Sequence, residues 1–591
     1  MIALWLLACV NERVQALERN IRDLQLTVDD LDAERRLLDQ AVRQAQAEGK
    51  LAYDRNPPGW DPSRPLPPGD PNRPDVILLS IDTLRADHLS AYGYARDTSP
   101  FIASLAARGT RYADNWSPSS WTLPSHTTML TGQLTWHHGV VEDTLQVAAD
   151  TPLLQERFQR AGYRTGGVTS ALFVSRKFGF DRGFDYFHDF DIHDARINNL
   201  ATVTAENVFA NATHWAQEQE AGQPIFLFLH VFDVHYQYSP PAPWDQKFDR
   251  KGEPRDARYK NYEHYLEHPL PEAQLAHQIA AYDEEIAYVD DQLRQFLERW
   301  EASGRSVYFA VTADHGEEFA ERGSWGHAHT LYPEQLHVPW VVVGPGVKTQ
   351  VVAQRSGNED IAPTLADLAG LEMPDADGVS RAAQLRGGAA VAGRVPAAFA
   401  DTSRFQTNRI RWHRPPYDLY VDLVNADIAV CDLRASPRCD RWITDPAVAA
   451  RAAEGLDGFL GDPWTAAVDG TVVVEGGAVY NGRGAPLAKV PLTAGSRFTV
   501  LPGDAKVSFV TADGTRSGPW QPLGGALPAP DAPLQFAGRA LSVGVALSDE
   551  EKAMLEALGY VQEGGGGADA GPAKAGKGAK GGKAKADAAS E

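Results

Sequence analysis

The pattern of hydrophobic and polar positions begins with a helical repeat. From Val14 to Val42, apolar residues recur at steps of three and four, interrupted at one seam position by Arg35. This heptad spacing predicts a coiled coil over about residues 10–50, although a single amphipathic helix folded back on the protein would show the same pattern. The proline-rich stretch 51–74 that follows predicts an extended linker.

From residue 75, short apolar runs alternate with helical patterns. Strands are predicted for DVILLSI, YRTGGVTS, PIFLFLHVF, SVYFAVT and VPWVVVG. Helices are predicted over 99–109, with Ser99 as its cap, and over 151–162, about 197–220 and about 272–302. Runs that are apolar on both faces are typical of a parallel sheet covered by helices. The predicted fold class is therefore α/β, with a mostly parallel central sheet flanked by helices in a catalytic domain over 75–462.

After about residue 463, β-branched runs are separated by glycine turns. This texture predicts a small C-terminal β module over 463–547. A short helix is predicted over 548–562, and the glycine, alanine and lysine tail 563–591 is predicted to be disordered.

Composition and charge narrow the classes of partner. The net charge of −22 argues against nucleic acid or an anionic membrane surface as the main partner. An anionic substrate would then need local positive charge, for which a bound metal is the simplest source. Cys431 and Cys439 are close enough in sequence to form a disulfide, and the alternative is two free thiols.

The N-terminus suggests export. Residues 6–9, Leu-Leu-Ala-Cys, resemble a bacterial lipoprotein box, although no basic segment precedes them and a chance match is the alternative. We expect residues 1–9 to be a truncated signal-like segment. The protein would then be exported, periplasmic or at the cell surface, and anchored to a membrane by its N-terminus. The coiled coil predicts a homo-oligomer.

Three of the predicted strands end in side chains that bind metals. Asp82 follows DVILLSI, Asp233 and His235 follow PIFLFLHVF, and Asp314 and His315 follow SVYFAVT. In open parallel sheets, ligands bind beyond the carboxyl ends of the strands. One such acidic residue usually caps a helix, but three sets in one sheet predict a divalent metal site. The imidazole of His315 favours manganese, zinc or magnesium over calcium.

The stretch WTLPSHTTML supplies a candidate nucleophile. Pro124 suits the first turn of a helix, so the hydroxyl of Thr122 would lie beside the unpaired amides of a helix N-terminus, where anions bind. Coordination to a divalent cation would lower the pKa of this hydroxyl and make it reactive. The alternative is a threonine that only caps the helix.

Six ordered blocks within about residues 75–385 resemble the sulfatase family of the alkaline phosphatase superfamily. They are DVILLSIDTLRADHLSAYGYARDTSPFIASLAARG, WTLPSHTTMLTG, HVFDVHYQYSPP, AYDEEIAYVDDQL, TADHGEEFAERGSWGHAHTLYPEQLHVPWVV and NEDIAPTLADLAG. The resemblance implies that fold and metal-assisted ester cleavage through a covalent enzyme intermediate.

The chain departs from the formylglycine sulfatases at two places. Their C-x-P-S-R motif is replaced by TLPSH at residues 122–126, and the second of the family's paired aspartates is replaced by Thr83. Threonine cannot be oxidised to the formylglycine aldehyde, because its extra methyl group would give a ketone. The remaining set is similar to the single-metal set of the threonine-nucleophile branch, and consists of Asp82, Thr122, Asp314 and His315.

The resemblance assigns further roles. Thr122 is the expected nucleophile, and His235 and His327 are expected to bind the ester oxygens or to protonate the leaving group. Arg85 and His126 are expected to hold the substrate anion or to support the metal ligands. A second metal on Asp233, His235 and His327 is an alternative.

The predicted function is a metal-dependent hydrolase that cleaves phosphoesters, phosphonate esters or sulfate esters through a threonine-linked intermediate. Three alternatives remain open: a phosphoryl head-group transferase, a true sulfuric ester hydrolase, and an inactive cell-surface binding protein.

Overall fold

The computed structural model describes residues 56–190, 203–249 except Gln237, 268–391 and shorter stretches between 398 and 552. The predicted signal-like segment, coiled coil and C-terminal tail lie outside these residues, so they stay predictions. The predicted helix over 548–562 is described only as far as residue 552. No helix in the described ranges is both long enough and apolar enough to cross a membrane.

The central sheet has eight strands in the order β11-β2-β10-β7-β1-β6-β4-β5. Within it, β10 is antiparallel to both of its neighbours, and the other paired strands run parallel. The predicted mostly parallel sheet is thus confirmed. The strands are β1 (Asp75–Ile81), β2 (Thr110–Tyr112), β4 (Arg164–Thr169), β5 (Tyr186–His188), β6 (Ile225–Val231), β7 (Val307–Thr312), β10 (Trp340–Val343) and β11 (Gln350–Val352).

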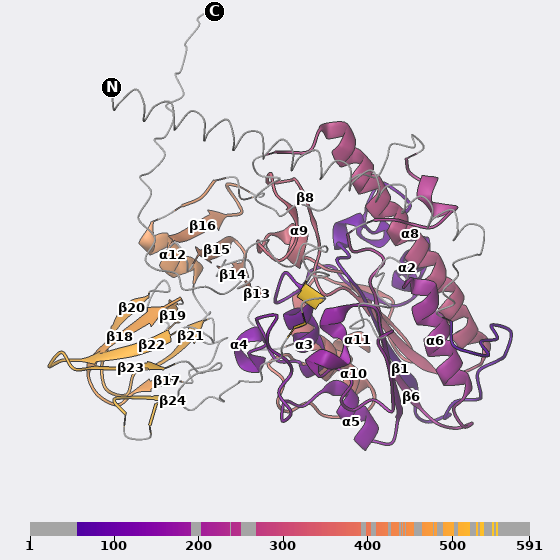
Figure 1. The fold of residues 1–591 in the computed structure, drawn as a ribbon, viewed down its shortest axis with the longest axis horizontal. Helices are drawn as coiled ribbons and strands as arrows, with labels where there is room; N and C mark the ends of the chain where they lie inside the picture. Colours follow the sequence, from indigo (N-terminus) through magenta and orange to yellow (C-terminus); the bar gives the residue numbers. More distant parts are fainter. Residues whose placement is uncertain are drawn as a thin grey trace, which may run out of the picture.

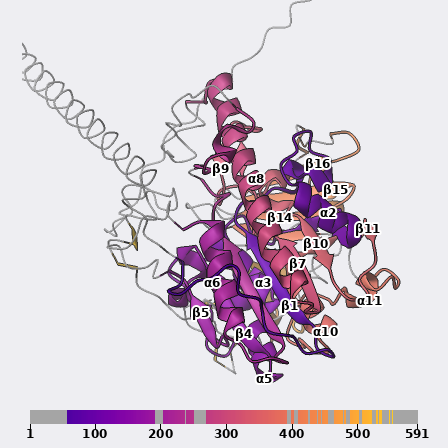
Figure 2. The ribbon, with the colours of Figure 1, turned by 90° about the vertical axis from the view of Figure 1, so that its right-hand side faces the viewer.

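Helices cover both faces of this sheet (Figure 1). Successive side chains of a strand point to opposite faces, so Ile77 and Leu79 of β1 join one buried cluster while Val76 and Leu78 join the other. The first cluster packs under the helices α2 (Pro100–Arg108), α6 (Ala205–Gln217) and α8 (Glu272–Ala302). These helices face the viewer in Figure 2. The second packs under α3 (Thr122–Thr131), α5 (Leu154–Arg160), α10 (Ile361–Leu368) and α11 (Ala382–Leu385).

The serine cap predicted for α2 is wrong. Ser99 occupies the N-cap position but makes no capping hydrogen bond. Its hydroxyl instead accepts the N–H of Ser90 at 3.0 Å. The amides of Phe101 and Ile102 donate to the carboxylate of Asp290 on α8, each at 2.8 Å. A carboxylate from a packed neighbour thus satisfies the helix terminus, which local sequence could not indicate.

A four-stranded antiparallel sheet follows the central domain and was not anticipated from the sequence. It comprises β13 (Ala398–Thr402), β14 (Arg409–Arg414), β15 (Tyr417–Asp422) and β16 (Asp427–Asp432). A disulfide joins Cys431 and Cys439 at its edge. The sheet supports the loop that carries His327, because Thr402 Oγ1 donates to the carbonyl of Ala328 at 3.2 Å and Arg411 Nη1 to that of Leu331 at 3.0 Å.

Two further antiparallel sheets lie in the range predicted to be a β module, drawn in yellow in Figure 1. Their strands are β17 (Trp464–Ala466), β18 (Gly470–Glu475), β19 (Ala478–Tyr480), β20 (Lys489–Leu492), β21 (Arg497–Leu501), β22 (Lys506–Thr511), β23 (Arg516–Trp520) and β24 (Leu534–Phe536). They share a separate buried cluster that includes Trp464 and Phe509. The chain then returns to the central domain, where Leu547 packs on the second cluster and Glu551 pairs with Lys177.

The short helix α4 (Thr135–His138) carries a buried histidine whose protonation opposes folding. The N–H of Val140 donates to His138 Nδ1 at 3.0 Å, so this nitrogen must be unprotonated. The opposite nitrogen lies 3.0 Å from Thr128 Oγ1. Burial, assisted by the nearby His137, lowers the pKa of His138 to about 3. The unfolded chain takes up this proton near pH 6.5, so stability present above that pH is lost as the pH falls from 6.5 toward 3.

We expect His138→Gln to flatten the acid side of the stability profile. Glutamine can accept from Val140 and donate to Thr128 without titrating. Between pH 6.5 and 4.5, the free energy of unfolding should fall less steeply than in the wild type, by up to about 1.4 kcal/mol per pH unit, the value for one proton. Urea unfolding at a series of pH values measures the slope. Parallel profiles for variant and wild type would contradict the expectation.

Candidate active site

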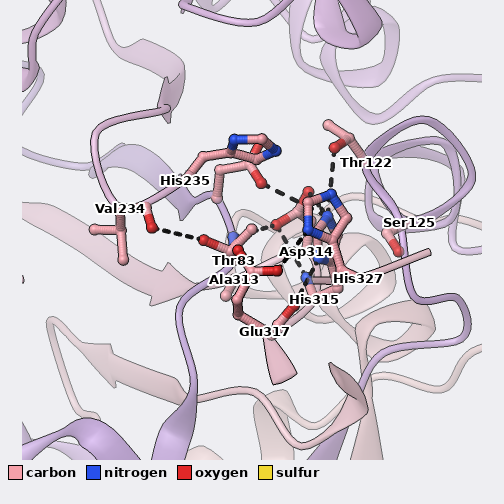
Figure 3. Close-up of polar contacts among 12 residues, drawn as sticks. Thr83, Thr122, Ser125, Val234, His235, Ala313, Asp314, His315, Glu317 and His327 are labelled. Atoms are coloured by element: carbon pink, nitrogen blue, oxygen red, sulfur yellow. Dashed lines mark hydrogen bonds and ion pairs between the residues drawn. The ribbon is translucent and has the colours of Figure 1, made fainter. Parts of the chain in front are cut away.

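The four predicted metal-site residues meet at the carboxyl ends of the central strands. Asp82 follows β1, Asp314 and His315 follow the adjacent β7, and Thr122 is the first residue of α3, with Pro124 in the first turn as expected. All four side chains are buried. His315 Nε2 lies 3.6 Å from Asp82 Oδ1. It also lies 3.3 Å from Asp314 Oδ2 and 3.4 Å from Thr122 Oγ1 (Figure 3).

One oxygen of each carboxylate is held by the protein. His230 Nε2 lies 3.2 Å from Asp82 Oδ2, while Asp314 Oδ1 accepts the N–H of His315 at 2.9 Å and that of Thr83 at 3.3 Å. The other two oxygens, Asp82 Oδ1 and Asp314 Oδ2, are buried and accept no hydrogen bond from the described residues. His315 Nδ1 contacts the carbonyl of Gly316 at 3.0 Å and therefore carries a proton, so Nε2, which faces these oxygens, is the nitrogen that a metal would bind.

This donor set fits a divalent cation. Buried oxygens without donors are unfavourable, and a cation satisfies them. Carboxylate, imidazole and hydroxyl ligands suit manganese, zinc or magnesium. Metal and protons compete for such a site, because the ligands must lose their protons to bind.

The electrostatics of the site also favour a positive charge. Burial raises the pKa of Asp82 to about 7, and the nearby Glu317 carboxylate adds to this. Burial and then the charge of Asp82 raise the pKa of Asp314. Burial alone would lower the pKa of His315, but Asp314 and Asp82 outweigh it and raise that pKa. Two adjacent carboxylates in a buried site thus hold protons unless a cation replaces them.

The imidazoles of His126 and His230 lie behind these ligands, 4.8 Å apart between ring centroids. His126 Nδ1 contacts the Thr122 carbonyl and Nε2 contacts Ser80 Oγ, both at 2.9 Å. Burial lowers the pKa of His126 to about 3 and that of His230 to about 4, so both rings are neutral. His126 is fully buried and holds the start of the helix that carries Thr122. Its predicted contact with substrate stays a prediction.

The guanidinium of Arg85 is engaged by the protein itself. Nε and Nη2 donate to the two carboxylate oxygens of Asp87 at 2.9 and 2.8 Å, and Nη1 donates to the Glu317 carbonyl at 2.9 Å and to Glu321. These contacts hold the segment 317–321, which follows His315, in place. Its predicted role in binding the substrate anion remains untested.

His235 and His327 lie beside the four predicted ligands. Their ring centroids are 4.9 Å apart, and that of His327 is 4.5 Å from that of His315. His235 stacks on Phe232, and burial lowers its pKa well below the usual value. Figure 3 draws both histidines together with Thr122, Asp314 and His315.

The three residues of the alternative second metal site, Asp233, His235 and His327, do not have the spacing of metal ligands. Asp233 Oδ1 accepts the N–H of Ala205 at 3.0 Å, at the start of α6. Among the described residues, two groups have the spacing of metal ligands, and neither includes Asp233, His235 or His327. The groups are Asp82 with Asp314 and His315, and His126 with His230 and Asp314.

Two residues of the site have backbone conformations that are unfavourable for their side chains. Thr83, directly after Asp82, has φ of 55°, and Ala328, directly after His327, has φ of 69°. A β-branched residue rarely adopts positive φ. Thr83 is held there by three hydrogen bonds, in which its N–H donates to Asp314, its hydroxyl donates to the Val234 carbonyl, and its carbonyl accepts from Tyr282. The surrounding contacts therefore enforce the strand-end geometry.

Sequence reasoning missed His230 and Glu317, which contact predicted residues, and Tyr238, which contacts Glu317. His230 is a polar residue in an otherwise apolar buried strand, which is a usable signal. Glu317 follows two residues after His315, but the contact it makes with His327 depends on how the intervening chain folds back.

Comparison with known proteins identifies the family of the domain that carries this site. Residues 74–371 match the family described as Sulfatase. Choline-sulfatase of Rhizobium meliloti (strain 1021) is 22% identical over 377 residues, which cover 53% of this chain and 72% of that protein.

Two solved structures show the same fold. Phosphonate monoester hydrolase from Silicibacter pomeroyi superposes with a TM-score of 0.54 at 20% identity, covering 64% of this chain and 93% of that one. A protein solved in complex with its substrate, D-glucosamine-2-N,6-O-disulfate, superposes with a TM-score of 0.53 at 18% identity, covering 64% of this chain and 95% of that one.

Proposed function

Because this chain belongs to the sulfatase family, we propose that it is a metal-dependent hydrolase of sulfate esters, phosphonate monoesters or related phosphoesters. One observation carries the proposal. Two buried carboxylate oxygens that accept no hydrogen bond from the described residues, an imidazole nitrogen and a threonine hydroxyl converge on one point at the end of the central sheet. The names of the similar proteins include both a sulfatase and a phosphonate monoester hydrolase.

The residues that would hold the metal are Asp82, Asp314, His315 and Thr122. A bound divalent cation would lower the pKa of the threonine hydroxyl and offset the charge of the ester anion. Manganese, zinc or magnesium suits this set better than calcium because one ligand is an imidazole.

Thr122 is positioned to attack the phosphorus or sulfur atom. Its place as the first residue of α3 puts its hydroxyl at the positive end of the helix, and His126 holds its backbone carbonyl. Thr122 Oγ1 loses its proton to the solvent as it forms the new ester bond. At the same time the bond to the leaving oxygen breaks, and His235 or His327 supplies a proton to that oxygen. Water then attacks the threonine-linked intermediate, which releases the acid and restores the hydroxyl.

A substrate panel tests the proposal. Purified protein, stripped of metal and then supplied with manganese, zinc, magnesium or calcium, is assayed on the p-nitrophenyl esters of sulfate and phenylphosphonate and on bis(p-nitrophenyl) phosphate. We expect turnover of at least one ester, restored by one of the first three metals and not by calcium. Activity that survives complete metal removal, or inactivity on all three esters with metal bound, would refute the proposal.

A further inference from the structure

The hairpin after β7 places two carboxylate–imidazole pairs side by side. Its strands are β8 (Glu318–Phe319) and β9 (Trp325–Gly326). Glu317 Oε1 lies 2.8 Å from His327 Nδ1, and Glu318 Oε2 lies 3.1 Å from His329 Nε2. All four side chains are buried. Each pair consists of a glutamate and a histidine, and the two glutamates are adjacent in sequence. The pairs differ in the residues that surround them.

The Glu318 pair is directed into the hairpin itself. His329 Nδ1 contacts the carbonyl of His327 at 2.6 Å, and His329 Nε2 contacts Ser324 Oγ at 2.6 Å as well as Glu318. Both ring nitrogens are therefore used in holding the hairpin together. Glu318 Oε1 also accepts from Thr330 Oγ1 at 3.0 Å.

The Glu317 pair instead borders the proposed site. The His327 ring lies against the rings of His315 and His235, and its Nδ1 contacts Glu317. A carboxylate that contacts Nδ1 keeps the proton on that nitrogen and defines the orientation of the ring, as carboxylates do for histidines in other active sites. His235 Nδ1 contacts the carbonyl of Tyr236 at 2.5 Å.

Glu317 is itself held in place on both sides. Tyr238 donates its hydroxyl to Oε2 at 3.1 Å, so each carboxylate oxygen has a separate partner. Tyr238 packs edge-on against Tyr282, with 5.4 Å between ring centroids. The backbone carbonyl of Glu317 accepts from Arg85 Nη1 at 2.9 Å. The carboxylate thus has little freedom to leave His327.

We infer that Glu317 is the positioning residue for His327, and that His327 is the group that assists departure of the leaving oxygen. The inference rests on the proposed function. When the bond from phosphorus or sulfur to the leaving oxygen breaks, its electron pair stays on that oxygen, which takes a proton from His327 Nε2. The proton on Nδ1 remains there, bonded to Glu317. The negative carboxylate stabilises the imidazole while it carries both protons.

Leaving-group dependence tests this role. A p-nitrophenolate leaves readily without a proton, whereas an alkoxide or phenolate needs one. In Glu317→Gln, kcat for the phenyl ester should fall about a hundredfold, kcat for the p-nitrophenyl ester should fall less than about fivefold, and KM should change little. Glu317→Asp should recover part of the loss because it restores the carboxylate.

The matched control is Glu318→Gln, which changes the neighbouring pair. It should affect both esters by the same factor. Metal content is measured in every variant, because Glu317 is two residues from His315. Equal losses on both esters in Glu317→Gln, or loss of bound metal, would show that Glu317 has only a structural role and would overturn the inference. A wild-type protein inactive on every ester would instead refute the proposed function, and this inference with it.

Discussion

Replacing Thr122 by valine is expected to lower kcat/KM by at least about a thousandfold, because the isosteric side chain lacks the attacking oxygen. The variant should still fold and bind metal, since three of the four predicted ligands remain. Rates are measured on the best p-nitrophenyl ester of the panel. In the wild type, rapid quenching followed by peptide mass analysis should place one phosphoryl or sulfuryl group on the peptide containing Thr122.

Thr127→Val is the matched control for this experiment. Thr127 lies in the same helix, is equally buried, and donates its hydroxyl to the Leu123 carbonyl at 2.8 Å without contacting the four predicted ligands. Loss of this hydroxyl should alter the stability of the protein, but kcat/KM should stay within about a factor of a few of the wild-type value. If Thr122→Val remained as active as Thr127→Val, Thr122 would not be the nucleophile.

Replacing Asp314 by asparagine is expected to weaken metal binding at least about a hundredfold, the upper end of what losing a hydrogen-bond partner of a ligand does. Wild-type protein should gain about 2.7 kcal/mol of stability when free metal is at a hundredfold excess over Kd. At the same metal concentration the variant should lose most of this gain. Without metal it should be at least as stable as the wild type, because it removes a buried charge beside Asp82. Calorimetric titration and thermal unfolding, each with and without manganese, measure both effects.

Asp377→Asn controls for the loss of a carboxylate elsewhere. Asp377 accepts the N–H of Leu134 at 2.8 Å and contacts His137, outside the proposed site. Its metal-dependent stabilisation should equal that of the wild type. Equal metal affinities in Asp314→Asn and Asp377→Asn would remove Asp314 from the ligand set.

The Thr122 and Asp314 variants test separate parts of the mechanism. Thr122→Val removes the attacking atom but retains three of the four predicted metal ligands, whereas Asp314→Asn removes a ligand and retains the attacking atom. A protein with a vestigial site would show neither effect. That outcome would favour the alternative of an inactive binding protein.

Much of the fold was predictable because it depends on local patterns. The run Asp75–Ile81 and the helix Glu272–Ala302 occur as expected from their apolar periodicity. The convergence of Asp82, Asp314 and His315 followed from a general rule, since ligands of parallel sheets gather at the carboxyl ends of neighbouring strands. The sheet order then placed β7, β1 and β6 next to one another, as that rule requires.

Contacts between distant segments were not predictable from these patterns. Asp290 caps α2 in place of Ser99, and the β13–β16 sheet supports the loop of His327, yet neither relation has a local signature. Arg85 lies one turn after Asp82 and was expected to hold the substrate anion or to support the metal ligands. Its contacts with Glu321 and a backbone carbonyl had no local signature.

The sequence by itself determined which side chains follow the strands, because alternation and periodicity are properties of neighbouring residues. Only the tertiary structure decided which oxygen of each carboxylate has a hydrogen-bond donor, and that the Glu317 carboxylate lies against His327 Nδ1. Those choices depend on atoms a few ångströms apart in space but far apart along the chain. Glu317 and Tyr238 meet across 79 positions, and His230 and Asp82 across 148.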